Sequence, residues 1–175
     1  MGSPIRPART EDIPAMSALA TRAFTDAYAD TSSPDDLAIH LDSQFSEASI
    51  EPEMGATGIR YFVADDGDGL LGLIKLRNSE RPSLVPAETA IEVQQLYVDT
   101  SRQRGGVGRE LMQRAVEETR AAGAGGIWLS VWTEADWATA FYRKFGFTSL
   151  GELDFYLGKT HYVDYLMWLP VNAND

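Results

Sequence analysis

The chain has 175 residues, the size of one domain, and its 44% hydrophobic and 23% charged residues are ordinary for a globular protein. Its net charge of −11 disfavours a nucleic-acid partner, because phosphate binding needs clustered Lys and Arg side chains. The absence of cysteine excludes disulfides and thiolate nucleophiles, and two histidines without a ligand pattern, His40 and His161, predict no metal centre. No apolar run reaches about 18 residues and the N-terminus lacks a signal pattern, so we expect no membrane association, a cytoplasmic location and a single domain over residues 1–175.

The first half of the chain predicts a strand, two helices and a hairpin. Residues 5–8 form the expected strand, and Thr10 is the expected cap of a helix with one apolar face. A second helix is expected after Ser33-Pro34, since proline suits the first helical position. Strands at 61–64 and 70–76 flank a run of Asp and Gly residues, which predicts a hairpin turn.

The second half predicts strands that alternate with helices. Residues 91–98 have apolar side chains on both faces, as in a central strand covered by helices. We expect an amphipathic helix after a glycine-rich turn, and then a strand at 127–132. A further helix, capped by Thr133 and Asp136, is expected to stop at Gly146. The last two strands, at 147–157 and 162–169, are expected to pair as a hairpin. This order predicts an α/β (α+β) fold, a mixed, mostly antiparallel central sheet of about seven strands flanked by about four helices.

The strongest chemical signal is the turn between the strand at 91–98 and the next helix, Gln103-Arg104-Gly105-Gly106-Val107-Gly108. Glycines let the backbone approach a bulky anion, and the first free N–H groups of the helix point toward it. The helix N-terminus carries about half a positive charge, suited to a pyrophosphate, and Arg104 and Arg109 add full charges. The segment lacks the Gly-Lys-Ser/Thr of a nucleotide P-loop and the third glycine of a dinucleotide fingerprint. Taken alone, such a turn is as often purely structural.

Two segments together carry a resemblance to a known family. Gln103-x-x-Gly106-x-Gly108 after a Tyr-Val strand end is similar to the pyrophosphate motif of the GCN5-related N-acetyltransferase (GNAT) superfamily. The segment Ala140–Phe147 resembles that family's A-x-x-F-Y-x-K-x-G-F helix end at the correct distance. The resemblance spans nearly the whole chain and implies a GNAT-like fold. The tail, at Phe155–Gly158 and Asp164–Met167, resembles more narrowly the bacterial spermine/spermidine N-acetyltransferases.

The resemblance implies that acetyl-CoA is the cosubstrate and that no metal takes part. In that family the pantetheine arm of the cofactor pairs like an extra strand with the strand that ends at Val98, so Leu96, Tyr97 and Val98 are expected to hold the arm. The pyrophosphate is expected to bind the turn and the start of the helix, at Gln103, Arg104, Gly105, Gly106, Val107, Gly108 and Arg109. The family often has an asparagine that contacts the cofactor where this chain has Ala135, so no cofactor role is assigned there. Trp132 and Trp137 are expected to pack around the cleft.

Tyr142 stands where the family has a tyrosine beside the cofactor sulfur. A phenol with a pKa of about 10 stays protonated at neutral pH and can donate a proton to a thiolate leaving group. Tyr142 is therefore the expected general acid. The alternative is a core aromatic residue that follows Phe141.

Glu92 is the candidate for handling the amine. An alkylammonium with a pKa near 10.4 must lose a proton before it attacks, at a cost of about 4–5 kcal/mol at pH 7. Glu92 lies fourteen residues before Gly106, the spacing of the catalytic glutamate in the histone-acetylating members, and strand alternation predicts that it shares a face with Leu96 and Val98. The alternative is a carboxylate that only binds the ammonium or pairs with an arginine in the sheet.

The leading hypothesis is transfer of an acetyl group from acetyl-CoA to a primary amine, a polyamine or another small amine, by direct attack in a ternary complex. The alternatives are a protein or peptide N-acetyltransferase and a non-catalytic acyl-CoA-binding module. Homodimers are common in the family, so a second copy of the chain is one expected partner. Acidic residues of the first two helices and of the last hairpin suit a cationic acceptor, although solvated helix faces explain them equally well: Asp26, Asp30, Asp35, Asp36, Glu47, Glu51, Glu53, Glu152, Asp154 and Asp164.

Overall fold

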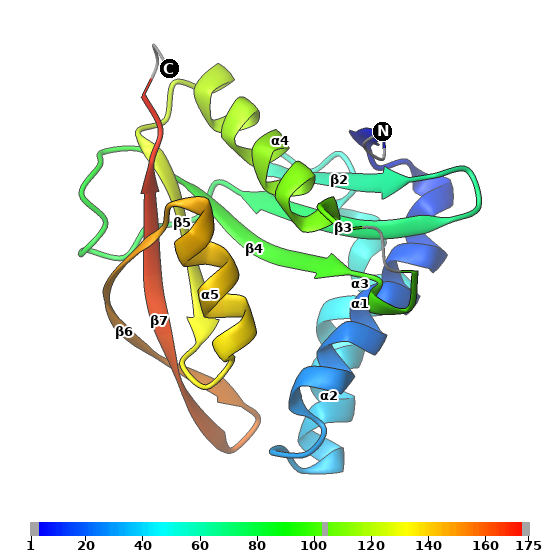
Figure 1. The fold of residues 1–175 in the computed structure, drawn as a ribbon. Coiled ribbons are helices and arrows are strands. Elements are labelled where there is room, and N and C mark those ends of the chain that lie inside the picture. The colour runs from blue at the N-terminus through cyan, green and yellow to red at the C-terminus, as the bar shows by residue number, and fades with distance from the viewer. Residues whose placement is uncertain (1–3, 103–104, 173–175) are drawn as a thin grey trace.

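The computed structural model describes residues 4–102 and 105–172, which form one seven-stranded sheet with helices on both faces (Figure 1). The strand order is β1-β2-β3-β4-β5-β7-β6, and neighbouring strands are antiparallel except for the parallel pair β4–β5. The predicted mixed, mostly antiparallel sheet is confirmed. Its strands are β1 (Ile5–Pro7), β2 (Ile59–Asp65), β3 (Leu70–Arg77), β4 (Ile91–Val98), β5 (Gly126–Trp132), β6 (Thr148–Leu157) and β7 (Thr160–Pro170).

The four predicted helices are present, together with one further short turn of helix. They are α1 (Ile13–Tyr28), α2 (Pro34–Phe45), α4 (Val107–Ala121) and α5 (Asp136–Phe145), and the additional α3 (Glu47–Ile50) follows α2. None of the helices within residues 4–102 and 105–172 is long and apolar enough to cross a membrane.

One of the three predicted helix caps is confirmed and two are wrong. The Ser33 hydroxyl accepts a hydrogen bond from the Asp36 amide (3.1 Å), as expected for the start of α2. Thr10 instead opens a one-turn 3₁₀ helix, Thr10–Asp12, and α1 follows it. The capping box of Thr133 and Asp136 does not form, because residues 133–135 make a separate turn and α5 begins only at Asp136, after Ala135.

The two faces of the sheet bury separate hydrophobic clusters. Helix α4 packs on one face through Val107, Leu111 and Met112, and Tyr142 and Phe145 of α5 lie against the same cluster. Helices α1 and α2 cover the other face, where Met16 and Phe24 pack against apolar residues of β2, β3 and β7. The chain after α5 returns through the β6–β7 hairpin, which therefore lies close to both helical layers (Figure 1).

The turn of the β6–β7 hairpin is fastened to α2. The Lys159 amide donates a hydrogen bond to Asp36 Oδ2 (3.2 Å). Gly158 has a φ of +58°, and a Cβ at this position would overlap the Asp36 carboxylate. Glycine is therefore required twice at this turn, for its backbone conformation and for its lack of a side chain.

Candidate functional site

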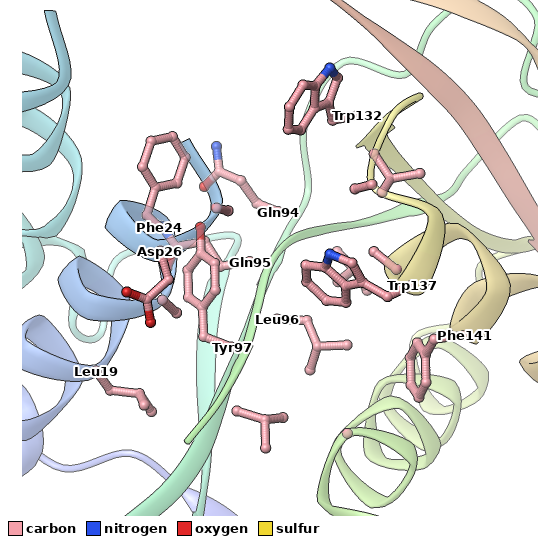
Figure 2. A pocket seen from close by; sticks show the side chains of 18 of the residues that line it. Leu19, Phe24, Asp26, Gln94, Gln95, Leu96, Tyr97, Trp132, Trp137 and Phe141 are labelled. Carbon is pink, nitrogen blue, oxygen red and sulfur yellow. The ribbon is translucent and has the colours of Figure 1, made fainter. Parts of the chain in front are cut away.

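The candidate site is a cavity that opens where β4 and β5 separate. These parallel strands pair only at Ile91–Ile127 and Glu92–Trp128, although β4 continues to Val98 and β5 to Trp132. The gap beyond Glu92 opens into a cavity of about 880 Å³. Figure 2 shows β4 running through this cavity, with Phe24 and Asp26 of α1 on one side and Trp137 and Phe141 of α5 on the other. Separated strands leave backbone groups without a strand partner, available to a ligand that pairs as a strand does.

A β-bulge at Gln94 reverses the direction of the side chains along β4. In the register with β3, Lys75 lies opposite Gln95 and Leu76 lies opposite Val93, so Gln94 is an extra residue. Val93 and Leu96 consequently pack on the same face of the sheet, the face of α4 and α5. Tyr97 points the other way, toward α1 (Figure 2).

The bulge also corrects the predicted position of Glu92. Ile91 and Val93 belong to the cluster under α4, so Glu92 between them points to the face of α1 and α2. The expectation that it shares a face with Leu96 and Val98 is wrong, because uninterrupted alternation does not hold across Gln94. Glu92 nevertheless lines the cavity, at the last β4–β5 pair.

Two side chains contact Glu92, one from β3 and one from the loop that follows β3. The Ser79 hydroxyl donates a hydrogen bond to Glu92 Oε2 (2.6 Å), and Arg77 Nε lies 3.6 Å from the same oxygen. The Glu92 side chain is 14% exposed. The arrangement holds the carboxylate at the base of the cavity and offsets part of its charge.

The glycine-rich turn leaves open space at the N-terminus of α4. Gly106 is the N-cap residue with a φ of +99°, and a Cβ built on Gly105 or Gly106 meets no atom within 4 Å. Because α4 begins at Val107, the first amides of the helix, including those of Gly108 and Arg109, lack helical partners and remain free to bind an anion. Gly106, Val107, Gly108 and Arg109 line the cavity with Leu96, Tyr97 and Val98. Gln103 and Arg104 lie outside the described residues.

Tyr142 lines the same cavity from α5. Its ring packs edge-on against Phe141 (5.3 Å between ring centroids) and Phe147 (5.6 Å), within the cluster on the α4 face. Burial raises the pKa of the Tyr142 phenol well above its ordinary value. The hydroxyl therefore stays protonated at neutral pH and is able to donate a proton.

Asp164 is a site residue whose position the sequence did not reveal beyond its presence in the last hairpin. It lies on β7 opposite Trp132 of β5, lines the cavity and is only 6% exposed. Its Oδ1 atom has no hydrogen-bond partner within the described residues. Burial raises the pKa of Asp164 to about 6, and the Ser130 hydroxyl partly opposes this shift. A carboxylate surrounded by apolar strand residues gives no signal in the sequence beyond its break in an otherwise apolar strand.

Aromatic side chains form the side of the cavity next to Asp164. We call Phe24, Tyr28, His40, Trp132 and Phe155 the aromatic wall. Tyr28 stacks on Phe24 (4.4 Å between ring centroids) and on Trp132 (5.4 Å). His40 also stacks on Phe24 (4.5 Å). All five line the cavity.

Trp132 and Trp137 thus behave differently. Trp132 packs as expected, but its ring partners are Tyr28 of the aromatic wall and Tyr162 of β7. Trp137 does not pack: it is 75% exposed at the N-terminal end of α5, two residues after Ala135, and its side chain borders the cavity (Figure 2).

Most of the acidic residues expected around the acceptor lie elsewhere. Only Asp26 and Asp164 of that set line the cavity in the described part of the chain. Glu53, for example, pairs with the buried Lys75 (2.8 Å) and accepts a hydrogen bond from Tyr61. Over residues 4–102 and 105–172, no group of three or more His, Asp or Glu side chains is arranged to hold a metal ion.

Comparison with known proteins identifies the family. Residues 14–147 match the model of the acetyltransferase (GNAT) family. A relative from Lactobacillus delbrueckii subsp. lactis, described as an uncharacterised N-acetyltransferase in the pepI 3′ region, is 28% identical over 158 residues, which cover 90% of this chain and 91% of the relative.

Solved structures share the fold at lower identity. The PaiA N-acetyltransferase of Thermoplasma acidophilum, determined in complex with coenzyme A, superposes with a TM-score of 0.76 at 20% identity, over 97% of this chain and 99% of that one. The ribosomal-protein-S18-alanine N-acetyltransferase of Escherichia coli superposes with a TM-score of 0.69 at 19% identity, over 97% and 94%. The separated strands and the open glycine turn agree with the family match. The chain therefore belongs to the GNAT family and is an acetyl-CoA-dependent N-acetyltransferase.

Proposed function

We propose that this protein transfers the acetyl group of acetyl-CoA to the primary amine of a small molecule by direct attack within a ternary complex. The observation that carries the proposal is the cavity between β4 and β5, which has the glycine turn at one end and the aromatic wall with Asp164 at the other. A cavity open to both faces of the sheet lets two reactants meet at the level of the strands. Holding them there contributes much of the rate, because it replaces a bimolecular encounter.

The cofactor side of the proposal rests on the α4 face. The amides at the start of α4 and the Arg109 side chain bind the pyrophosphate, where Gly105 and Gly106 leave room for it. The backbone of Leu96, Tyr97 and Val98, unpaired with β5, holds the pantetheine arm. Gln103 and Arg104 belong to the same proposed turn.

The chemical step needs two residues of the chain that transfer protons. Glu92 accepts a proton from the ammonium, and the neutral nitrogen then forms a bond to the acetyl carbon while the carbon–sulfur bond breaks. Tyr142 gives a proton to the departing sulfur, and the second proton that the nitrogen loses restores the phenol. The products are the N-acetylated amine and the free thiol of coenzyme A.

A peptide N-terminus is the second candidate acceptor. The likeness to an alanine N-acetyltransferase of a ribosomal protein supports it, since such an enzyme has the same fold.

Substitution of Gly106 tests the pyrophosphate site. Gly106→Asp keeps a residue that tolerates a positive φ, but adds bulk and negative charge where the phosphates are proposed to lie. We expect the KM for acetyl-CoA to rise by about 10-fold or more with little change in the KM for amine, as measured by thiol release.

Gly123→Asp is the matched control, because Gly123 at the other end of α4 also has a positive φ (+67°) and open space around it. Both variants carry a similar backbone cost, about 1 kcal/mol. An equal effect of the two on acetyl-CoA would show that the turn does not bind the pyrophosphate.

Substitution of Tyr142 tests the general acid. Tyr142→Phe keeps the ring contacts with Phe141 and Phe147 but removes the donor. We expect kcat to fall by about 10²–10⁴-fold while the affinity for coenzyme A is retained. Tyr165→Phe, on the same face but outside the cavity, is the control and should leave kcat unchanged. Near-wild-type turnover of a folded Tyr142→Phe protein rules out the role.

Substitution of Glu92 separates a base from a ligand. Glu92→Gln retains an acceptor for Ser79 but cannot take a proton. If Glu92 is the base, kcat/KM for the amine falls at pH 7 and recovers toward pH 9.5, since the free amine increases about tenfold per pH unit below a pKa near 10.4. The exposed Glu80→Gln serves as control. A raised KM at every pH, with no recovery, contradicts proton transfer and leaves Glu92 as a binding group.

A further inference from the structure

Only one of the four carboxylates that line the cavity is buried and has an oxygen atom without a hydrogen-bond partner in the described residues. Asp99 pairs with Arg22 (3.2 Å), Glu92 is held by Ser79 and Arg77, and Asp26 is exposed to water. Asp164 is 6% exposed, and its Oδ1 atom accepts no hydrogen bond from any described residue. A buried acceptor without a donor costs free energy in the folded protein, so its position in a cavity points to a donor that arrives with a ligand.

The surroundings of Asp164 show what kind of donor is missing. Asp164 and Trp132 are direct partners across β5 and β7, so their side chains lie on the same face of the sheet. The charge of Asp164 also contributes, after burial, to a raised pKa of Tyr28, which places Tyr28 of the aromatic wall near the carboxylate. Gln94 Oε1, at the bulge, is the second unpartnered buried acceptor lining this cavity. Acceptors within an apolar, aromatic enclosure suit one ammonium group, which carries donors only.

The body of the ligand must match the rest of the enclosure. Phe24 and Tyr28 of the aromatic wall are stacked between other rings, so they offer the cavity their edges, and Leu19, Ala23 and Ala27 of α1 line the cavity beside them. A polyamine brings several charges, and the described lining offers it no second buried carboxylate with an unpartnered oxygen. Ring edges favour an aromatic group whose face they can meet, and each such edge-to-face contact adds affinity beyond the area it buries.

Resting on the proposed acetyl transfer, we infer that the acceptor is a primary monoamine with an aromatic body, whose ammonium binds Asp164 and whose ring packs on the aromatic wall formed by Phe24, Tyr28, His40, Trp132 and Phe155. The acidic residues of α1 and α2 that lie outside the cavity then have no part in choosing the acceptor.

The test measures binding first, so that it does not depend on turnover. Calorimetric titrations with coenzyme A present compare 2-phenylethylamine with spermidine, which lacks the ring, and with 2-phenylethanol, which lacks the charge. We expect 2-phenylethylamine to bind at least about 10-fold more tightly than either, because only it satisfies both the carboxylate and the wall. Tighter binding of spermidine, or equal binding of the alcohol, overturns the inference.

Asp164→Asn is the informative variant, with Asp30→Asn, an exposed residue outside the cavity, as control. We expect Asp164→Asn to weaken binding of 2-phenylethylamine by about 10–100-fold, to leave 2-phenylethanol unaffected and to leave the affinity for coenzyme A intact. Equal weakening of the amine and the alcohol indicates a structural role and overturns the assignment.

Thermal unfolding shows whether the Asp164→Asn variant is folded and whether Asp164 is buried as described. The pKa of Asp164 in the folded protein, about 6, exceeds its ordinary value of 3.8, so the ionised carboxylate destabilises the fold above pH 6 and this penalty disappears below about pH 4. Asp164→Asn should therefore raise Tm at pH 8 and leave it unchanged at pH 4. A lower Tm at pH 8 contradicts a buried carboxylate that destabilises the fold and overturns the inference.

Thiol release from acetyl-CoA separates this inference from the proposed function. Binding of 2-phenylethylamine without thiol release for any amine tested overturns acetyl transfer but leaves the amine pocket. Faster acetylation of spermidine than of 2-phenylethylamine overturns the aromatic acceptor but leaves the transferase. A peptide with N-terminal phenylalanine that binds more tightly than 2-phenylethylamine also overturns it, in favour of a protein acceptor.

Discussion

The separation of two strands is the constraint on which the rest of the structure depends. β4 and β5 pair at two positions and then diverge, and no other neighbouring pair in the described sheet stops so early relative to its length. A sheet that opens in the middle loses hydrogen bonds that continuous pairing would supply. What it gains is a passage between the layer of α4 and α5 and the layer of α1 and α2. The bulge at Gln94 belongs to the same arrangement, because it directs Leu96 and Tyr97 to opposite layers just where the passage opens.

The linear order of the elements was accessible from the sequence because the local signals are strong. Glycines and prolines separate periodic segments, and β4 was predicted with the bounds that the structure has, Ile91–Val98. The cavity-lining positions of Gly106 and Tyr142 followed from two motifs with a fixed relation to a strand end and a helix end. Both motifs consist of residues that are close together in the chain, so they can be recognised from the sequence alone.

What the sequence could not supply depends on pairing across the sheet. The face of Glu92 was predicted wrongly because a bulge is a property of two strands, and nothing at Gln94 itself requires an extra residue there. Asp164 was one of ten acidic residues in two regions of the chain, and only the register with β5 and the covering helices separates it from those in water. Burial, and with it the raised pKa, arises from the assembled fold.

The hydrogen bond between the hairpin turn and α2 separates the part of the cavity proposed for the acceptor from the part proposed for acetyl-CoA, so the two parts can change independently in evolution. Gly158 and Lys159 meet Asp36 across more than a hundred residues of sequence, so α2 and the hairpin form a frame that does not include the glycine turn before α4. Substitutions within this frame can reshape one half of the cavity while the phosphate-facing amides stay in place. Related proteins can therefore evolve a different acceptor specificity through substitutions in the frame alone, and keep the site for acetyl-CoA.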